Sequence, residues 1–230
     1  MKVVICLAHN YRAFDKPFVI SLFKIQRYFF EHNLGELKIV YSEGLQLDEM
    51  REGVVRKAMT HEPDYVLLLD TDMDFPEDCI EKMLNHLEQK KEYDAVCGMY
   101  CFRQEPFLPM VFKGWDEYSN GCDFMEKIPD EPFDIDCTGL GIILIRNEFL
   151  KKCEGRLFKK TDNFGEEMYF FKEHRPKTLC DPSIDCGHYN LEKVDVKRFL
   201  KEHGIKKTNG IYEVPFNLRM KFSEKLRNNK

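Results

Sequence analysis

The chain has 230 residues, enough for one substantial hydrophobic core, and we expect one α/β domain rather than two small domains. Its formal net charge of −5 argues against general nucleic-acid binding. No apolar stretch reaches transmembrane length, and the apolar run after Met1 is too short for a secretory signal. We therefore expect a cytoplasmic protein whose nine cysteines are reduced thiols.

The first 70 residues predict an alternation of buried strands and helices. Apolar runs at residues 2–7, 37–41 and 65–69 predict three strands, and residues 15–33 and 48–60 predict the helices between them. This order indicates a doubly wound, mostly parallel sheet, whose ligands collect at the carboxyl ends of the strands. The side chains expected near that edge are Ala8, His9 and Asn10 after the first strand, Glu43 after the second, and Arg51 in the second helix.

Three aspartates at alternate positions, Asp70, Asp72 and Asp74, follow the most apolar of these strands. Because neighbouring carboxylates repel one another, a sheltered cluster of them favours a divalent cation. The alternatives are structural: Asp72 also suits a turn. For Asp74 we favour a helix N-cap, because Pro76 follows it at the start of a predicted helix.

The middle of the chain predicts a helix over 76–90, a strand over 94–101, and a β-rich insertion with loops over 102–133. Gly139 and Gly141 precede a strand over 142–145, where glycine permits close backbone approach. A helix is expected over 147–153 and a short edge strand over 178–181.

Two further positions suggest chemistry. Glu166 and Glu167 begin an aromatic-rich helix, where carboxylates suit the helix dipole and could also serve as a general base. His188, which follows Gly187, is either polar surface or a further metal ligand.

We expect residues 1–190 to form the single domain and residues 191–230 to form a basic, partly helical C-terminal extension. The extension has 11 Lys and Arg against 5 Asp and Glu, a surplus of +6. Such a segment either packs on the domain or makes a peripheral contact with a membrane or an anionic partner. The near-helical spacing of Phe199, Leu200 and Ile205 favours packing.

The order of these motifs resembles that of GT-A-fold glycosyltransferases, close to glycosyltransferase family 2. The Arg of the family's Arg-Asn pair is present, followed here by Glu52, and the last residue of its Gly-Glu-Asp motif is Glu167 here. The matching segments, in chain order, are Ala8-His9-Asn10, Arg51-Glu52, Asp70-Thr71-Asp72, Gly139-Leu140-Gly141 through Arg146, Gly165-Glu166-Glu167 and Gly187-His188.

The resemblance implies a GT-A fold with a mostly parallel central sheet, flanking helices and a small β-rich portion on the acceptor side. It implies metal-dependent, inverting transfer of a sugar from a nucleoside-diphosphate sugar of UDP or GDP type to a hydroxyl of a carbohydrate or other acceptor. Glu167 would be the base and Glu166 its acceptor-binding neighbour. Mn²⁺ or Mg²⁺ would be held by Asp70, Asp72 and His188, and the nucleotide sugar by Ala8, His9, Asn10, Glu43, Arg51, Asp70 and Thr71.

Three alternatives remain at this stage. The chain could bind a sugar nucleotide without transferring the sugar, if the carboxylate at Glu167 is not a competent base. It could be a nucleotidyltransferase, although these usually carry a Gly-rich phosphate loop where this chain has Ala8-His9-Asn10-Tyr11-Arg12. The acidic turn could also be purely structural.

Overall fold

A seven-stranded sheet forms the centre of the protein in the computed structural model, which describes residues 1–9, 14–44, 46–116, 121–162, 165–189 and 193–228. Strand β11 is antiparallel to both of its neighbours and β9 is antiparallel to β12, while the other pairs are parallel. The predicted α/β class and mostly parallel sheet are confirmed. In sheet order, the strands are β2 (Glu36–Glu43), β1 (Lys2–His9), β3 (Tyr65–Leu69), β11 (Ile142–Arg146), β5 (Ala95–Met99), β12 (Thr178–Asp185) and β9 (Phe133–Ile135).

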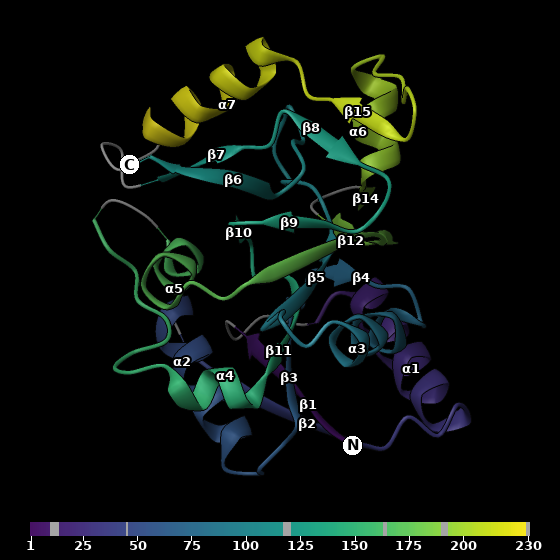
Figure 1. Cartoon of the computed structure of the whole chain (residues 1–230), viewed down its shortest axis with the longest axis vertical. Coiled ribbons are helices and arrows are strands. Elements are labelled where there is room, and N and C mark those ends of the chain that lie inside the picture. Colours follow the sequence, from purple (N-terminus) through teal and green to yellow (C-terminus); the bar gives the residue numbers. More distant parts are fainter. Residues whose placement is uncertain (10–13, 45, 117–120, 163–164, 190–192, 229–230) are drawn as a thin grey trace.

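Helices cover both faces of this sheet (Figure 1). On one face lie α1 (Lys16–Glu31) and α3 (Cys79–Gln89); on the other lie α2 (Leu47–Met59), α4 (Asn147–Lys152) and α5 (Glu166–His174). Successive strand residues point to opposite faces, so Val3 and Ile5 pack with α1, whereas Val4 and Cys6 pack with α2. Burial on both faces explains why these strands are continuous apolar runs.

The predicted β-rich insertion is confirmed, and it forms a second layer with the C-terminal segment. Phe222 of α7 packs its ring against Phe102 and Phe124, at centroid distances of 4.6 and 5.8 Å. Phe199 and Tyr212 are also buried in this layer, so the extension packs on the protein as expected. The elements are β6 (Val111–Asp116), β7 (Gly121–Phe124), β8 (Lys127–Pro129), β10 (Cys137–Thr138), α6 (Val196–Glu202), β15 (Ile211–Glu213) and α7 (Phe216–Asn228).

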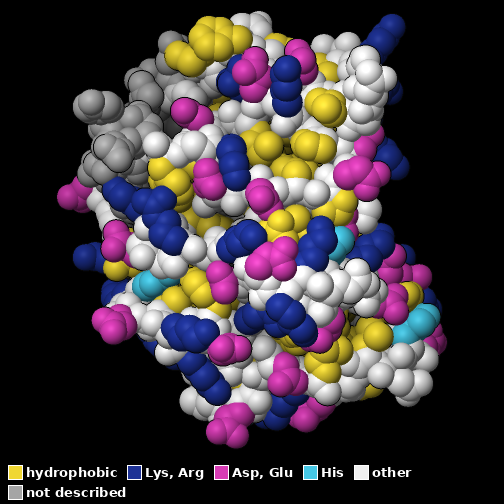
Figure 2. All heavy atoms as spheres, in the orientation of Figure 1, with side chains coloured by type: hydrophobic (Ala, Val, Ile, Leu, Met, Phe, Trp, Pro, Cys, Tyr) yellow, Lys and Arg dark blue, Asp and Glu magenta, His cyan; other side chains and the backbone are white. Residues whose placement is uncertain are grey.

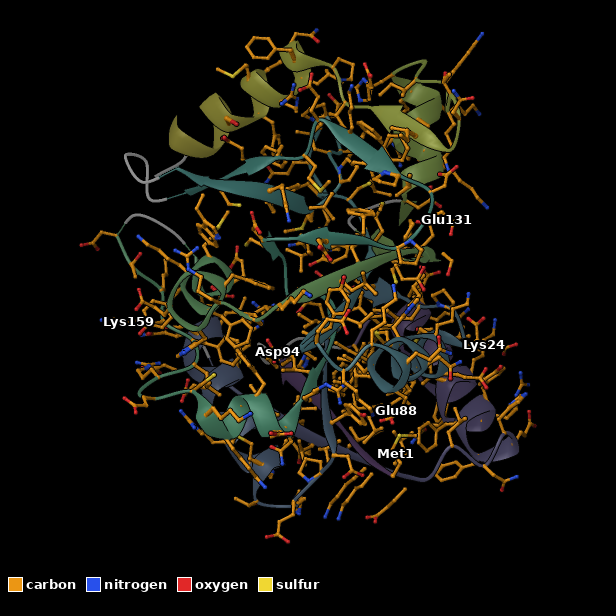
Figure 3. The ribbon with its side chains drawn as sticks, viewed as in Figure 1. Met1, Lys24, Glu88, Asp94, Glu131 and Lys159 are labelled. Carbon is orange, nitrogen blue, oxygen red and sulfur yellow. The ribbon has the colours of Figure 1, made fainter. Side chains whose placement is uncertain are left out.

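Charged side chains of both signs cover the surface of the protein. Lys24 on α1 and Lys159 between α4 and α5 project from opposite sides of the protein (Figure 3). On the face shown in Figure 2, Lys and Arg side chains are interspersed with Asp and Glu rather than gathered by sign. Among the described residues, no helix is both long enough and apolar enough to cross a bilayer.

Two sequence predictions about local structure are wrong. Asp74 does not cap a helix: α3 begins at Cys79 with Asp78 at its N-cap position. Asp74 instead lies in β4 (Met73–Asp74) and accepts a hydrogen bond from the Gly187 backbone N–H at 2.9 Å. The predicted edge strand at 178–181 is the internal, eight-residue strand β12, because β9 from the insertion pairs along its outer side.

Gly139 and Gly141 give the Tyr100 side chain room to pack under the start of β11. A Cβ at position 139 would lie 2.1 Å from the Tyr100 hydroxyl oxygen, and one at position 141 would lie 2.9 Å from it. The Gly141 backbone N–H donates to that hydroxyl at 2.9 Å. The predicted close approach at these glycines is therefore confirmed, and its partner is a buried tyrosine.

We expect Gly139→Ala to lower the free energy of unfolding by about 1–3 kcal/mol through overpacking against Tyr100. Adding Tyr100→Phe should recover part of that loss, because it removes the atom nearest to the new methyl group. Urea denaturation measures both. Gly53→Ala, in the open interior of α2, is the matched control and should be neutral or stabilising. A loss from Gly139→Ala no larger than that of the control would contradict this packing.

Candidate active site

One cleft of about 650 Å³ brings together side chains from distant parts of the chain. It lies where the carboxyl ends of β1 and β3 meet the N-terminus of α5, the edge at which ligands bind open α/β sheets. Asn10 is outside the described residues, and Glu43 is exposed and not among the described lining residues. Nine predicted site residues line the cleft: Ala8, His9, Arg51, Asp70, Thr71, Asp72, Glu166, Glu167 and His188.

Arg51 holds one side of the cleft together. Its guanidinium is buried and joins Asp70, at the tip of β3, to Glu166, in the first turn of α5. The Nη2–Oδ1 distance to Asp70 is 2.7 Å, and Nη1 donates to Glu166 Oε1. Burial alone would lower the pKa of Arg51, but the carboxylates around it raise that pKa above its ordinary value. Arg51 is therefore charged whenever the protein is folded.

Glu167 is the carboxylate that this cation does not fully neutralise. Burial first, and the neighbouring Glu166 second, raise the pKa of Glu167 to about 7, and Arg51 lowers it by less. Its carboxylate folds back over Gly165, where a Cβ would lie 2.5 Å from Oε2. A carboxylate with a near-neutral pKa in a cleft has the properties of a general base.

Asp72 and His188 form a second cluster in the same cleft. β13 (Gly187–Tyr189) pairs antiparallel with β4 and places His188 opposite Met73, so that its Nε2 lies 3.6 Å from Asp72 Oδ1. The Nδ1 atom lies 2.9 Å from the Cys101 carbonyl oxygen. Because a carbonyl only accepts, Nδ1 carries a proton, and Nε2 is the ring nitrogen that faces Asp72 and that could bind a metal through its lone pair when unprotonated.

Asp72 and His188 lie close enough together to contact one divalent cation after a small movement. Two ligands that each lie about 2.1 Å from an octahedral ion are about 3.0 Å apart, so the 3.6 Å between Asp72 Oδ1 and His188 Nε2 would have to shorten for both to bind. Among the described residues, no group of three His, Cys, Asp or Glu side chains could hold an ion, so Asp70 does not join this pair in such a group. With only two protein ligands, an ion here would take its remaining ligands from phosphate and water oxygens.

The acidic stretch after β3 does not form the cluster of mutually repelling carboxylates that its sequence suggests. Each aspartate has partners of its own: Asp70 pairs with Arg51, Asp72 with Arg103, and Asp74 accepts from Gly187. The strand ends at Leu69, so the alternation of side chains does not continue into the aspartates. Repulsion among them is therefore no evidence for a cation.

His9 adds an unsatisfied polar atom to the cleft. Its side chain is buried at the end of β1, and its Nδ1 has no hydrogen-bond partner among the described residues. The ring stacks on Phe14, with the centroids 4.3 Å apart. A buried ring nitrogen without a partner is costly, so a polar ligand group that pairs with it would gain binding energy.

Sequence reasoning missed several cleft residues, among them Arg103 and Tyr100. Arg103 Nη1 lies 2.6 Å from Asp72 Oδ2. Burial alone would raise the pKa of Asp72, but His188 first and Arg103 second hold that pKa below its ordinary value. Tyr100 stands edge-on to His188 at a centroid distance of 5.6 Å. Their position directly after a buried strand of the parallel sheet was the available signal, since such positions line the ligand-binding edge.

We expect Arg51→Met to lower the free energy of unfolding at pH 7.5 by about 3–5 kcal/mol, because it leaves buried carboxylates without their cation. The loss should shrink at pH 5, below the pKa of about 7 for Glu167, because that carboxyl is then protonated and one fewer negative charge depends on Arg51. Urea denaturation at the two pH values measures it. Arg27→Met, which removes an exposed ion pair with Glu77 at 2.9 Å, should cost under about 1 kcal/mol. Equal losses in the two variants would contradict a buried charge centre at Arg51.

Comparison with known proteins identifies the fold. Neither a protein-family model nor a curated protein matches the sequence. Among solved structures, A197 from STIV is similar over 86% of this chain and 92% of its own, with 21% identity and a TM-score of 0.62. GalNAc-T7, solved with UDP, GalNAc and Mn²⁺, is similar over 83% of this chain and 44% of its own, with 14% identity and a TM-score of 0.53. The chain thus spans nearly all of A197 but less than half of GalNAc-T7, and it has the GT-A fold of glycosyltransferases.

Proposed function

We propose that the protein is a metal-dependent glycosyltransferase. It transfers a sugar from a nucleoside-diphosphate sugar of UDP or GDP type to a hydroxyl of a carbohydrate or other acceptor, with inversion at the anomeric carbon. The observation that carries the proposal is one cleft containing both a carboxylate of near-neutral pKa, Glu167, and a metal-suited pair, Asp72 with His188. The shared fold with GalNAc-T7, whose structure contains UDP and Mn²⁺, supports it.

The donor side of the cleft is built for a diphosphate. Mn²⁺ or Mg²⁺ held by Asp72 and His188 would stabilise the negative charge that develops on the departing diphosphate. His9 and Ala8 line the wall at the end of β1, and a small movement of the His9 ring would let its buried, unpartnered Nδ1 pair with a polar group of the nucleotide. Asp70, which Arg51 holds at 2.7 Å, would contact the ribose of the donor. Thr71 lines the cleft between the two aspartates.

The acceptor side is built around Glu167. In a direct displacement, its carboxylate removes the proton from the acceptor hydroxyl as that oxygen forms a bond to the anomeric carbon. The bond from the anomeric carbon to the diphosphate oxygen breaks on the opposite side, and its electrons leave with the nucleoside diphosphate. Glu166, held by Arg51, cannot take this role as readily because its charge is already paired; it suits a hydrogen bond to the acceptor.

We expect Glu167→Gln to lower kcat for sugar transfer by about 10²- to 10⁴-fold, with little change in the KM for the donor. In the wild type, kcat should rise with pH through about 7 and then level, because Glu167 must lose its proton to act as a base. Initial rates of nucleoside-diphosphate release in the presence of acceptor measure both effects.

Glu173→Gln, an exposed position on the same helix, is the control for the Glu167 substitution and should transfer sugar at the wild-type rate. Unchanged transfer by Glu167→Gln would rule out this base. Donor binding by the wild type without any transfer would favour the alternative of a sugar-nucleotide-binding protein, and release of pyrophosphate would favour a nucleotidyltransferase.

We expect UDP or GDP at about 100 times its Kd to stabilise the wild type by about 2.7 kcal/mol when Mn²⁺ is present. For a chain of this length, that corresponds to a rise in Tm of roughly 5–10 °C. Chelation of the metal, or Asp72→Asn, should remove most of the rise. Asp78→Asn, outside the cleft at the N-cap of α3, should keep it. A rise that chelation does not change would contradict the metal dependence.

A further inference from the structure

Arg103 shares a carboxylate with the proposed metal site. Its Nη1 lies 2.6 Å from Asp72 Oδ2, while the other oxygen of Asp72 faces His188 Nε2 at 3.6 Å. The Arg103 side chain is 48% exposed, so its remaining N–H groups stay accessible from the cleft. A diphosphate that binds through a metal ion held by Asp72 and His188 would therefore lie within reach of this guanidinium.

The loop that carries Arg103 is fastened at both of its ends. The Phe102 backbone N–H donates to the Leu108 carbonyl at 2.9 Å, and the Phe107 N–H donates to the Gln104 carbonyl at 2.8 Å. The Phe102 ring packs against Phe222 of α7 in the second layer. Arg103 thus projects into the cleft from a closed loop rather than from a free segment.

The C-terminal segment holds this loop from its outer side. His203, directly after α6, has its Nε2 at 2.9 Å from the Pro106 carbonyl oxygen, which makes Nε2 a donor. The Arg198 guanidinium lies over the Phe107 ring, 4.9 Å from its centroid. A segment remote in sequence from the acidic stretch is therefore in direct contact with the loop that brings a cation to Asp72.

Electrostatics gives this arrangement a specific consequence. A guanidinium and a divalent cation on the two oxygens of one carboxylate repel each other, which opposes binding of the metal alone. A diphosphate between them attracts both, and the planar fork of an arginine suits phosphate oxygens. Metal and diphosphate should then favour each other's binding, and by linkage the coupling is the same in both directions.

We propose that Arg103 binds the donor diphosphate together with the metal ion and makes the two bind cooperatively, and that α6 and His203 position the loop for this task. The inference rests on the proposed function, and it gives the C-terminal segment a part in donor binding. Arg103 is a ligand-binding residue in this scheme, and His203 is a positioning residue.

The test compares Arg103→Gln with the wild type. The probes are Mn²⁺ and whichever of UDP and GDP binds the wild type more tightly. Paramagnetic resonance measures the Kd of Mn²⁺ with and without nucleotide, and calorimetry measures the Kd of the nucleotide at saturating Mn²⁺. We expect the nucleotide Kd to rise about tenfold or more, the loss of one charge-assisted contact. The Kd of Mn²⁺ alone should stay the same or fall, so the cooperativity decreases.

Arg27→Gln, which breaks an exposed arginine–carboxylate pair outside the cleft, should match the wild type in every titration. His203→Ala should raise the nucleotide Kd by a smaller factor without raising the Kd of Mn²⁺ alone, and His203→Gln, which keeps a donor, should restore it. A His203→Ala protein with wild-type affinities would overturn the positioning role.

An unchanged nucleotide Kd in Arg103→Gln, beside a wild type that binds both probes, would overturn the inference alone. A higher Kd for Mn²⁺ alone in that variant would also overturn the inference, because Arg103 would then act only by orienting Asp72. If the wild type binds neither UDP nor GDP with Mn²⁺, the proposed function fails and the inference fails with it.

Discussion

One buried guanidinium, that of Arg51, determines the electrostatics of the cleft. It extends from α2 to the tip of β3 and the first turn of α5, and so fixes three elements relative to one another through Asp70 and Glu166. A single positive charge cannot neutralise the three carboxylates around it. Burial first and the neighbouring Glu166 second raise the pKa of Glu167 to about 7, and the shared Arg51 offsets only part of that rise. Packing around Arg51 therefore affects both the stability of the fold and the basicity of Glu167.

The cleft holds two clusters with different chemistry. Asp72, His188 and Arg103 supply a carboxylate, an imidazole and a cation for the proposed diphosphate and metal. Glu167, in the other cluster, has a pKa raised to about 7. The acidic stretch after β3 serves both clusters, because Asp70 belongs to the Arg51 cluster and Asp72 to the metal-suited pair. This division gives a physical reason for two aspartates separated by one residue.

Much of the fold could be predicted because its strands are buried on both faces and therefore appear as unbroken apolar runs. Because the carboxyl ends of parallel strands meet at one edge of a sheet, the sequence alone predicted that Asp70, Asp72 and His9 lie near one another. The roles of β12 and Asp74 were wrongly predicted because they depend on long-range pairing: β9 covers an apparent edge strand, and Gly187 occupies the oxygen expected to cap a helix. Local sequence carries no record of such partners.

The contacts made by Arg103 and Arg51 were beyond prediction for the same reason. Arg103 lies in an irregular loop whose position depends on α6 and α7, more than 90 residues further along the chain. The resemblance to known glycosyltransferases indicated Arg51, but only the structure shows that it joins Asp70 to Glu166. The near-neutral pKa of Glu167 follows from that arrangement and from burial, neither of which a motif contains.

The central claim is that burial and the neighbouring Glu166 raise the pKa of Glu167 more than the shared Arg51 lowers it, which leaves Glu167 as a base. Titration of its carboxyl group tests this claim. Glutamate labelled with ¹³C at the carboxyl carbon gives one resonance for each side chain, and the spectrum of Glu167→Gln assigns the resonance of interest. We predict an inflection near pH 7, well above the ordinary value of 4.5. An inflection near pH 4.5 would contradict the claim, since Glu167 would then be an ordinary carboxylate that neither burial nor Glu166 makes a stronger base.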